Sequence, residues 1–321
     1  MNKIAIITGF LGGVKNRYMQ YQPNRTIEEK IRLAGSIEGI DGLELCYPED
    51  FSDVDLLKKA LAEEGLGVSS INVRSRRQDR WTRGSFTSAR KEEREEVVDD
   101  FMKVTEIAES LGVDKLTSCP LNDGHDYVFE MNYLEAYDDA ADVFRRICEL
   151  DKKMKYCIEY KVNDPRVRCL LGTAGESLAF CEYVGADNLG VTMDFGHSIL
   201  GHERPAQALS MLHLAGRLFH VHLNDNDRLW DWDELPGAFN VNELIEFMYY
   251  LRKCNYDNSW YAFDITSKEV DTAEHFRLAA KITRKFEKLA ASIPMDKMDE
   301  LMGKRNPNDS FELMFDTVFG K

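Results

Sequence analysis

The chain has 321 residues, of which 44% are hydrophobic, and its formal net charge is −15 at neutral pH. This size and composition predict a well-packed, water-soluble protein. The acidic charge argues against a nucleic-acid partner, because a surface that binds phosphates needs a positive electrostatic field.

The seven cysteines are scattered along the chain without close pairing. No CxxC spacing occurs, so neither a disulfide framework nor a zinc ribbon is indicated. The N-terminus enters a strand-like segment without a signal-peptide pattern, and no apolar stretch has the length of a membrane span. We therefore expect a cytoplasmic protein without a membrane partner.

Short β-rich segments alternate with longer amphipathic segments. The predicted strands lie at residues 3–8, 42–46, 67–73, 114–119, 155–160, 189–194, 217–223 and 260–265. The predicted helices lie near residues 26–37, 53–64, 88–111, 132–151, 173–184, 205–214, 241–253 and 270–291. This alternation predicts an α/β protein with the (β/α)8 TIM-barrel fold, because a doubly wound sheet usually contains fewer units.

Several element boundaries carry a chemical signal. A capping box begins at Thr26, and Gly65 and Gly112 follow predicted helices as C-terminal caps do. We expect residues 1–290 to form a catalytic barrel and residues 291–321 to form a C-terminal helical extension. The Met, Leu and Phe residues of this extension suggest subunit contacts, and hence a homo-oligomer, either a dimer or a tetramer.

Polar side chains end four consecutive predicted strands: Glu159, Asp194, His222 and Asp264. In a barrel these strand ends meet at one mouth, where active sites lie. Any one of them alone would be read as a hydrogen-bonded loop residue, but three carboxylates together repel one another unless they bind protons or a cation. Three carboxylates and one imidazole suit Mn²⁺ or Mg²⁺, with Co²⁺ or Zn²⁺ as further options.

A second polar set lies beside the first. His197 follows Asp194 by three residues, and Asp231 and Asp233 alternate around a tryptophan, so that both carboxylates can point the same way. Together with Asp194, these residues offer a second cation site. The cofactor prediction is therefore one or two divalent cations per chain.

Two further residues accompany the predicted ligands. His220 shares a strand face with His222, and it is either a ligand, a partner of a ligand or an inward-facing barrel residue. Lys161 lies two residues beyond Glu159, on the same side of an extended segment. It could donate a hydrogen bond to a substrate oxygen, and its alternative role is a plain salt bridge.

Three motifs carry a family resemblance. "EYKVNDPR" (159–166) is similar to the E-P-K-P-N-E-P-R element of xylose isomerases, "MDFGH" to their carboxylate-x-x-His pair, and "HVHLND" with "DWD" to their strand-seven ligand and D-x-D pair. The chain thus resembles the xylose isomerase-like TIM-barrel superfamily, with xylose isomerase and L-rhamnose isomerase nearest in pattern. The resemblance implies a first metal site of Glu159, Asp194, His222 and Asp264, a second of Asp194, His197, Asp231 and Asp233, and a catalytic Lys161.

Within this superfamily, a histidine at 222 is nearer to L-rhamnose isomerases and ketose 3-epimerases. Asp264 stands where the epimerases use a longer glutamate, which favours isomerisation without excluding 3-epimerisation. Arg228 matches a substrate-contacting arginine of the epimerases, and the first histidine of the chain is His125. The expected substrate-binding residues are Arg228, His220, His125 and Trp81.

The predicted function is a divalent-metal-dependent sugar isomerase that interconverts an aldose and a ketose at a two-metal site. Glu159 or Asp264 would act as the base in an enediolate variant, and Lys161 would steady the developing charge. The alternatives are a ketose 3-epimerase with one metal, an abasic-site endonuclease-like barrel, and a non-catalytic sugar-binding barrel. Abasic-site endonucleases use further histidines after the early strands to hold additional zinc, whereas this sequence has no histidine before residue 125.

The loops after the early strands are expected to set the sugar specificity, and they include Arg17 and Tyr18. One of them is locally basic and contains Arg74, Arg76, Arg77, Arg80 and Arg83. This basic loop is expected to fold over the barrel mouth, to make subunit contacts or to be solvated surface. It would permit a phosphate group on the sugar.

Overall fold

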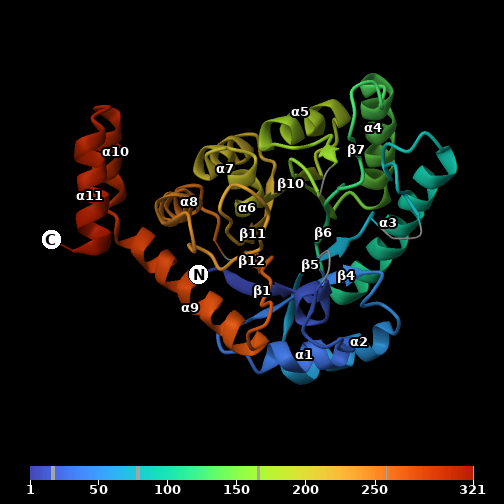
Figure 1. The fold of residues 1–321 in the computed structure, drawn as a ribbon, viewed down its shortest axis with the longest axis horizontal. Helices are drawn as coiled ribbons and strands as arrows, with labels where there is room; N and C mark the ends of the chain where they lie inside the picture. Colours follow the sequence, from blue (N-terminus) through green and yellow to red (C-terminus); the bar gives the residue numbers. More distant parts are fainter. Residues whose placement is uncertain (16–18, 77–79, 165–166, 258, 321) are drawn as a thin grey trace.

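The structure is a computed structural model that describes residues 1–15, 19–76, 80–164, 167–257 and 259–320. Parallel strands close into a barrel (Figure 1) in which β1 pairs with both β4 and β12. The barrel strands are β1 (Lys3–Ile7), β4 (Gly42–Tyr47), β5 (Gly67–Val73), β6 (Lys115–Ser118), β8 (Lys155–Glu159), β10 (Leu189–Asp194), β11 (Leu218–Leu223) and β12 (Trp260–Phe263). The predicted (β/α)8 barrel is confirmed.

Helices surround the barrel and continue beyond it. They are α1 (Ile27–Gly35), α2 (Val54–Glu64), α3 (Lys91–Leu111), α4 (Tyr133–Leu150), α5 (Ala174–Val184), α6 (Phe195–Leu200), α7 (Pro205–Leu214), α8 (Val241–Lys253), α9 (Thr272–Ser292), α10 (Met295–Gly303) and α11 (Pro307–Phe319). Smaller elements complete the fold: the 3-10 turn η1 (Thr8–Leu11), the ribbon β2 (Val14–Lys15) with β3 (Gln20–Tyr21), and the ribbon β7 (Gly124–His125) with β9 (Arg168–Cys169).

The predicted caps explain several of these boundaries. Thr26 accepts a hydrogen bond from the backbone of Glu29, whose side chain accepts one in return, so α1 begins with a capping box. Gly65 and Gly112 end α2 and α3 in the left-handed conformation, with φ values of 65° and 69°. A side chain disfavours this conformation, which is why glycine ends these helices.

The strands separate an apolar outer layer from a partly polar interior. Along β4, Leu43 and Leu45 join the main hydrophobic core under the helices, whereas Glu44 between them faces the barrel interior. The interior also contains the hydrogen-bonded pair Thr117 and Thr192, with their hydroxyls 2.7 Å apart. Alternation along a strand therefore delivers polar groups to the barrel axis while the helices bury the apolar side chains.

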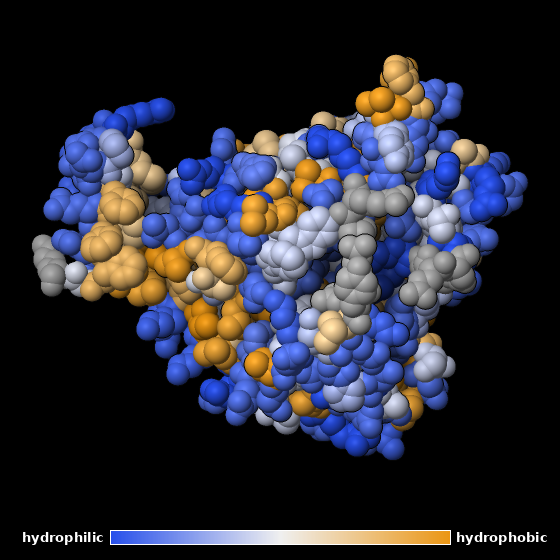
Figure 2. Space-filling model, viewed as in Figure 1, coloured by the Kyte–Doolittle hydropathy of each residue, from blue (hydrophilic) through white to orange (hydrophobic). Residues whose placement is uncertain are grey.

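The C-terminal helices α10 and α11 form a hairpin that stands away from the barrel at the end of α9 (Figure 1). Apolar residues gather where this hairpin meets the body (Figure 2). Among the described residues, no helix is long and apolar enough to cross a membrane. The predicted C-terminal helical extension is thus confirmed as structure.

Candidate metal centre

Four side chains from consecutive strands converge at the C-terminal mouth of the barrel. Glu159 ends β8, Asp194 ends β10, His222 lies on β11, and Asp264 directly follows β12. Their ligand atoms all lie within 4.8 Å of one another. Nδ1 of His222 is 3.2 Å from Oε1 of Glu159, 3.8 Å from Oδ2 of Asp194 and 3.9 Å from Oδ2 of Asp264. The structure therefore brings together all the residues predicted for the first metal site.

The electrostatics of this cluster favour a cation. Burial and the neighbouring charges of Glu159 and Asp194 raise the pKa of Asp264 to about 7. Burial also raises the pKa of Asp194, and the partial relief from His197 does not cancel it. A divalent ion would remove this repulsion, and three carboxylates with one imidazole are hard and borderline donors that suit Mn²⁺ or Mg²⁺. The residues present therefore fit a divalent metal.

A buried carboxylate on β4 fixes the histidine ligand. Oε2 of Glu44 lies 3.1 Å from Nε2 of His222 and 3.0 Å from Nε2 of His220. Burial raises the pKa of Glu44, but the two histidines outweigh it and hold this pKa well below its usual range. An ionised carboxylate only accepts hydrogen bonds, so Nε2 of His222 donates to Glu44, and Nδ1 is the nitrogen that faces the three carboxylates and that a metal ion would use after losing its proton.

Glu44 is absent from the predicted site residues, although its sequence context holds a signal. It is a charged residue between two leucines in "GLELC", inside a strand whose residues are buried. Ser70 and Asn72 on β5 also donate hydrogen bonds to its carboxylate. A carboxylate in the middle of a buried strand needs such partners, and the sequence alone does not identify them.

Asp194 is held in place by its own loop. Its Oδ1 accepts a hydrogen bond from the backbone nitrogen of His197 at 2.7 Å, which caps α6. Its Oδ2 accepts one from Nδ2 of Asn224 at 3.2 Å, and Oδ1 of Asn224 in turn accepts from the backbone of Gly196. These hydrogen bonds join the "MDFGH" and "HLND" motifs and fix the position of the Asp194 carboxylate.

The residues predicted for the second metal site are already engaged with one another. Nζ of Lys161 lies 2.7 Å from Oδ2 of Asp231 and 2.6 Å from Oδ2 of Asp164. Nε2 of His197 lies 3.1 Å from the same Asp231 oxygen. Asp233 is placed beside Thr266. In the described part of the chain, Asp231 and Asp233 belong to no cluster with metal-binding spacing.

Charge compensation explains this arrangement. Burial raises the pKa of Asp231, but Lys161 and His197 outweigh it and bring this pKa far below its ordinary value. Burial lowers the pKa of His197, while Asp194 and Asp231 raise it to a final value of about 9. Two cationic side chains thus occupy the neighbourhood in which a second divalent ion was expected.

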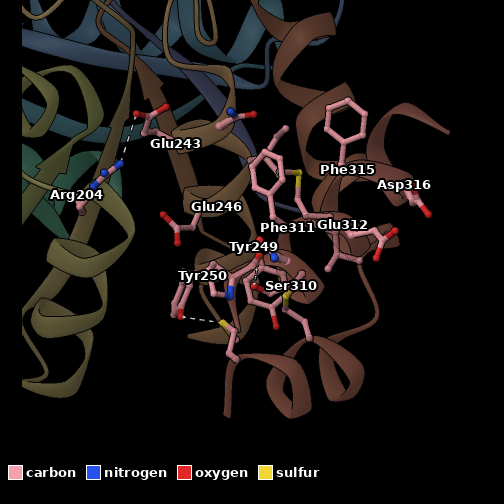
Figure 3. A pocket seen from close by; sticks show the side chains of 18 residues that line it. Arg204, Glu243, Glu246, Tyr249, Tyr250, Ser310, Phe311, Glu312, Phe315 and Asp316 are labelled. Carbon is pink, nitrogen blue, oxygen red and sulfur yellow. Dashed lines mark hydrogen bonds and ion pairs between the residues drawn. The ribbon is translucent and has the colours of Figure 1, made fainter. Parts of the chain in front are cut away.

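The centre opens into a cavity of about 720 Å³. This volume lies within the range of small-molecule sites, roughly 300–1,000 Å³. Its described lining includes Glu159, Lys161, His197 and Asp264 from the later strands, and Lys15, Arg25, Arg74 and Arg76 from the earlier loops. A second cavity, of about 1,090 Å³, lies between α8 and the C-terminal hairpin (Figure 3) and contains none of the predicted site residues.

The predicted substrate-binding residues are not among the described residues that line the cavity at the metal cluster. Nη2 of Arg228 donates to Glu243 at 2.7 Å, and His125 is hydrogen-bonded to Tyr133 on the outer ribbon. Trp81 is buried beneath the guanidinium of Arg80, 3.9 Å from the ring centre. His220 lies deeper in the barrel, where burial lowers its pKa to about 4. Arg17, Tyr18 and Arg77 lie outside the described residues.

Comparison with known proteins agrees with the barrel fold described above. The family model described as "Xylose isomerase-like TIM barrel" matches residues 31–285. The chain belongs to this family. It is 27% identical over 193 residues to L-ribulose 3-epimerase of Mesorhizobium japonicum, across 59% of this chain and 61% of that protein. It is 32% identical over 120 residues to xylose isomerase of Streptomyces lividans, across 35% of this chain and 30% of that protein.

The chain thus spans less than two thirds of these relatives' lengths. A solved structure of L-ribulose 3-epimerase superposes with a TM-score of 0.69 and 20% identity, covering 96% of this chain and 100% of that one. At this identity, the likeness shows the shared fold. The relatives are sugar epimerases and isomerases, and the epimerase matches a larger share of the chain. The comparisons therefore favour the 3-epimerase alternative over the two-metal isomerase.

Proposed function

We propose that this protein is a ketose 3-epimerase that uses one divalent metal ion. The observation that carries the proposal is the four-residue cluster of Glu159, Asp194, His222 and Asp264, beside an Asp231 that is already paired with Lys161. A relative named L-ribulose 3-epimerase supports the same reading. The proposal replaces the two-metal aldose–ketose isomerase as the leading function.

The proposed chemistry needs two proton-transfer groups and one charge-stabilising group. When bound, the metal ion would polarise the ketose carbonyl and hold the adjacent oxygen. One carboxylate, Glu159 or Asp264, then takes the proton from C3, and the other returns a proton to the opposite face of the planar carbon. Both side chains line the cavity, as this exchange requires. The Lys161 ammonium bonds to Asp231 and Asp164, and its third N–H would donate a hydrogen bond to a substrate oxygen.

The protonation state of Lys161 supports this role. Burial lowers its pKa, but Asp231 and Asp164 outweigh the burial and raise the pKa well above its ordinary value. The side chain is therefore a fixed cation in the cavity wall. A fixed cation can stabilise negative charge that develops on a substrate oxygen, although it is a poor proton acceptor.

The test is turnover of L-ribulose and D-fructose in D2O by metal-stripped protein to which Mn²⁺ is restored. We expect inversion at C3 with deuterium incorporated there, and loss of inversion without metal. Glu159→Gln and Asp264→Asn should each reduce the rate by at least about a hundredfold. Detectable inversion should survive Asp231→Asn, which removes a residue of the predicted second site.

Two outcomes would redirect the assignment. Conversion between aldose and ketose that disappears in Asp231→Asn would restore the two-metal isomerase. Tight metal binding without turnover of any ketose or aldose would favour the sugar-binding barrel.

A further inference from the structure

Part of the wall of the cavity at the metal cluster is cationic. The later strands contribute most of its acidic groups, whereas the loops after β1 and β5 contribute Lys15, Arg25, Arg74 and Arg76. Such a concentration is unexpected in a chain with 56 acidic and 41 basic residues. It therefore calls for a local explanation.

Arg74 is built into this wall. It directly follows β5, and its backbone nitrogen donates to the carbonyl of Tyr47 at 3.1 Å. Its Nη2 donates to the sulfur of Cys46 at 3.1 Å, and its Nε is buried without a hydrogen-bond partner. A neutral thiol is a weak acceptor, so most of the donor capacity of this guanidinium is unused. Burial raises the pKa of Cys46, which keeps the thiol neutral.

The loop after β1 makes room for this guanidinium. A Cβ atom at Gly9 would lie 2.5 Å from Nη2 of Arg74. Any other residue at position 9 would therefore push the guanidinium away from its present place. The charge of Arg74 is close enough to Glu49 and Asp264 to interact with both. Arg74 consequently lies within reach of a ligand that also contacts the metal cluster.

The described cationic side chains that line this cavity are of two kinds: some form ion pairs with carboxylates, and others do not. Lys30 is paired with Asp50 at 3.0 Å, and Lys161 with Asp231 at 2.7 Å. Among the described residues, no carboxylate oxygen lies within 4.0 Å of a side-chain nitrogen of Lys15, Arg25, Arg74 or Arg76. Arg74 and Arg76 are also half-buried, so water compensates their charge less well than on an open surface. Their missing partner would be an anion that enters with the ligand.

We propose that the natural substrate is an anionic sugar, whose carboxylate or phosphate is bound by Arg74 and Arg76 while its carbonyl end faces the metal cluster. This inference rests on the proposed epimerase function and narrows its substrate class. Guanidinium groups bind carboxylate and phosphate through two parallel hydrogen bonds, which fixes orientation as well as charge. Carboxylate and phosphate share this chemistry, so the experiment must separate them.

The test compares D-fructose, D-fructose 6-phosphate and D-fructuronate as substrates of the Mn²⁺-loaded protein. We expect one of the two anionic ketoses to exceed D-fructose in kcat/KM by about ten- to a hundredfold. This preference should weaken as ionic strength rises, because salt screens the attraction. The preferred anion identifies the group as phosphate or carboxylate.

The variant Arg76→Gln should reduce the ratio of anionic to neutral kcat/KM by about tenfold, mainly through a higher KM for the anion. The matched control is Arg80→Gln, because Arg80 belongs to the same basic loop but pairs with Glu96 and Asp100. It removes the same charge and should leave the ratio unchanged. If the ratio falls equally in both variants, the preference depends on the net charge of the protein and not on Arg76, and the inference is overturned.

The inference and the proposed function can fail separately. Equal, salt-independent kcat/KM values for all three ketoses would overturn the anionic substrate while the epimerase function stands. If no ketose is inverted, equilibrium dialysis with the same three sugars tests the anion site independently of catalysis. Tighter binding of an anionic sugar that Arg76→Gln removes would preserve the anion site without the epimerase function. Equal binding of all three would overturn the anion site.

Discussion

The Glu44 carboxylate lies between two histidines in the barrel interior, 3.0 Å from Nε2 of His220 and 3.1 Å from Nε2 of His222. In Glu44→Gln, an amide NH2 group can face these two N–H groups, so that donors meet donors. His222 would then favour the tautomer with the proton on Nδ1, which removes the lone pair that points to the metal cluster. We expect the affinity for Mn²⁺ to fall by about ten- to a hundredfold, measured by calorimetry or by the EPR signal of free Mn²⁺.

Asp50→Asn is the matched control for this prediction. Asp50 is also a buried carboxylate beside β4, where it accepts a hydrogen bond from Cys46 and pairs with Lys30. Its loss should lower the free energy of unfolding without a comparable loss of metal affinity. If Glu44→Gln binds Mn²⁺ as tightly as the unmodified protein, Glu44 does not orient the ligand. The 15N NMR shifts of His222 report the tautomer independently of activity.

Lys161 also permits a prediction at the residue scale. The side chains of Lys161 and Asp231 are only 10% and 6% exposed, so the removal of one partner leaves a buried charge that water compensates poorly. Lys161→Met should lower the free energy of unfolding by roughly 3 kcal/mol in metal-free protein. The double variant Lys161→Met/Asp231→Asn should recover much of this loss, because the orphaned charge is also removed.

Denaturant titration of the four forms gives the coupling energy. Lys152→Met is a suitable control, because Lys152 forms an exposed pair with Glu149 and should change stability by less than about 1 kcal/mol. Additive losses in the double variant would show that Lys161 and Asp231 are not energetically coupled and would contradict this explanation.

At the scale of elements, the predicted strands agree closely with the observed ones because buried parallel strands are short apolar runs between loops. The ends of elements are less well defined by such runs. The first strand ends at Ile7 rather than at residue 8, because Thr8 begins the 3-10 turn. The last ends at Phe263, so that Asp264 lies just beyond the strand rather than inside it.

The helix caps provide an element-scale prediction. Gly112 has a φ of 69° and no heavy atom within 4 Å of an added Cβ, so the cost of Gly112→Ala is purely conformational. We expect a loss of about 1 kcal/mol in the free energy of unfolding. Gly303 ends α10, also in open space but without a positive φ, so Gly303→Ala should be neutral or stabilising. Equal effects of the two variants would contradict this explanation.

The predicted substrate contacts show what element patterns leave undetermined. Arg228 lies in the expected loop, but its backbone has a φ of 69° and donates to Oδ1 of Asn226. Its guanidinium pairs with Glu243 on α8 instead of lining the cavity. Glu44 is similar, since it contacts a histidine 178 residues away in the chain. Such pairings depend on barrel closure and loop conformation, and hydrophobic periodicity describes neither.

At the scale of the whole molecule, the C-terminal hairpin carries an apolar face that the barrel does not cover. Phe311, Phe315 and Phe319 form a ladder on α11, with ring centres 6.2 and 4.8 Å apart. Each of the three is about half-exposed, at 53%, 48% and 56%. Phe311 and Phe315 also border the cavity that faces α8 (Figure 3). Exposed apolar patches of this kind mark association surfaces in soluble proteins.

This face is the surface at which we expect the subunits of the predicted homo-oligomer to meet. If a second copy covers it, Phe315→Asp should convert the oligomer to monomer, because a buried carboxylate without a partner is costly at an apolar contact. Sedimentation velocity over a range of concentrations measures the change. Leu214→Asp is the control, because Leu214 is 86% exposed at the end of α7. A monomer at every concentration in the unmodified chain, or an oligomer that survives Phe315→Asp, would exclude the hairpin as the subunit interface. Because the cavity lining described above comes from the barrel and its loops, the monomeric variant should still bind Mn²⁺.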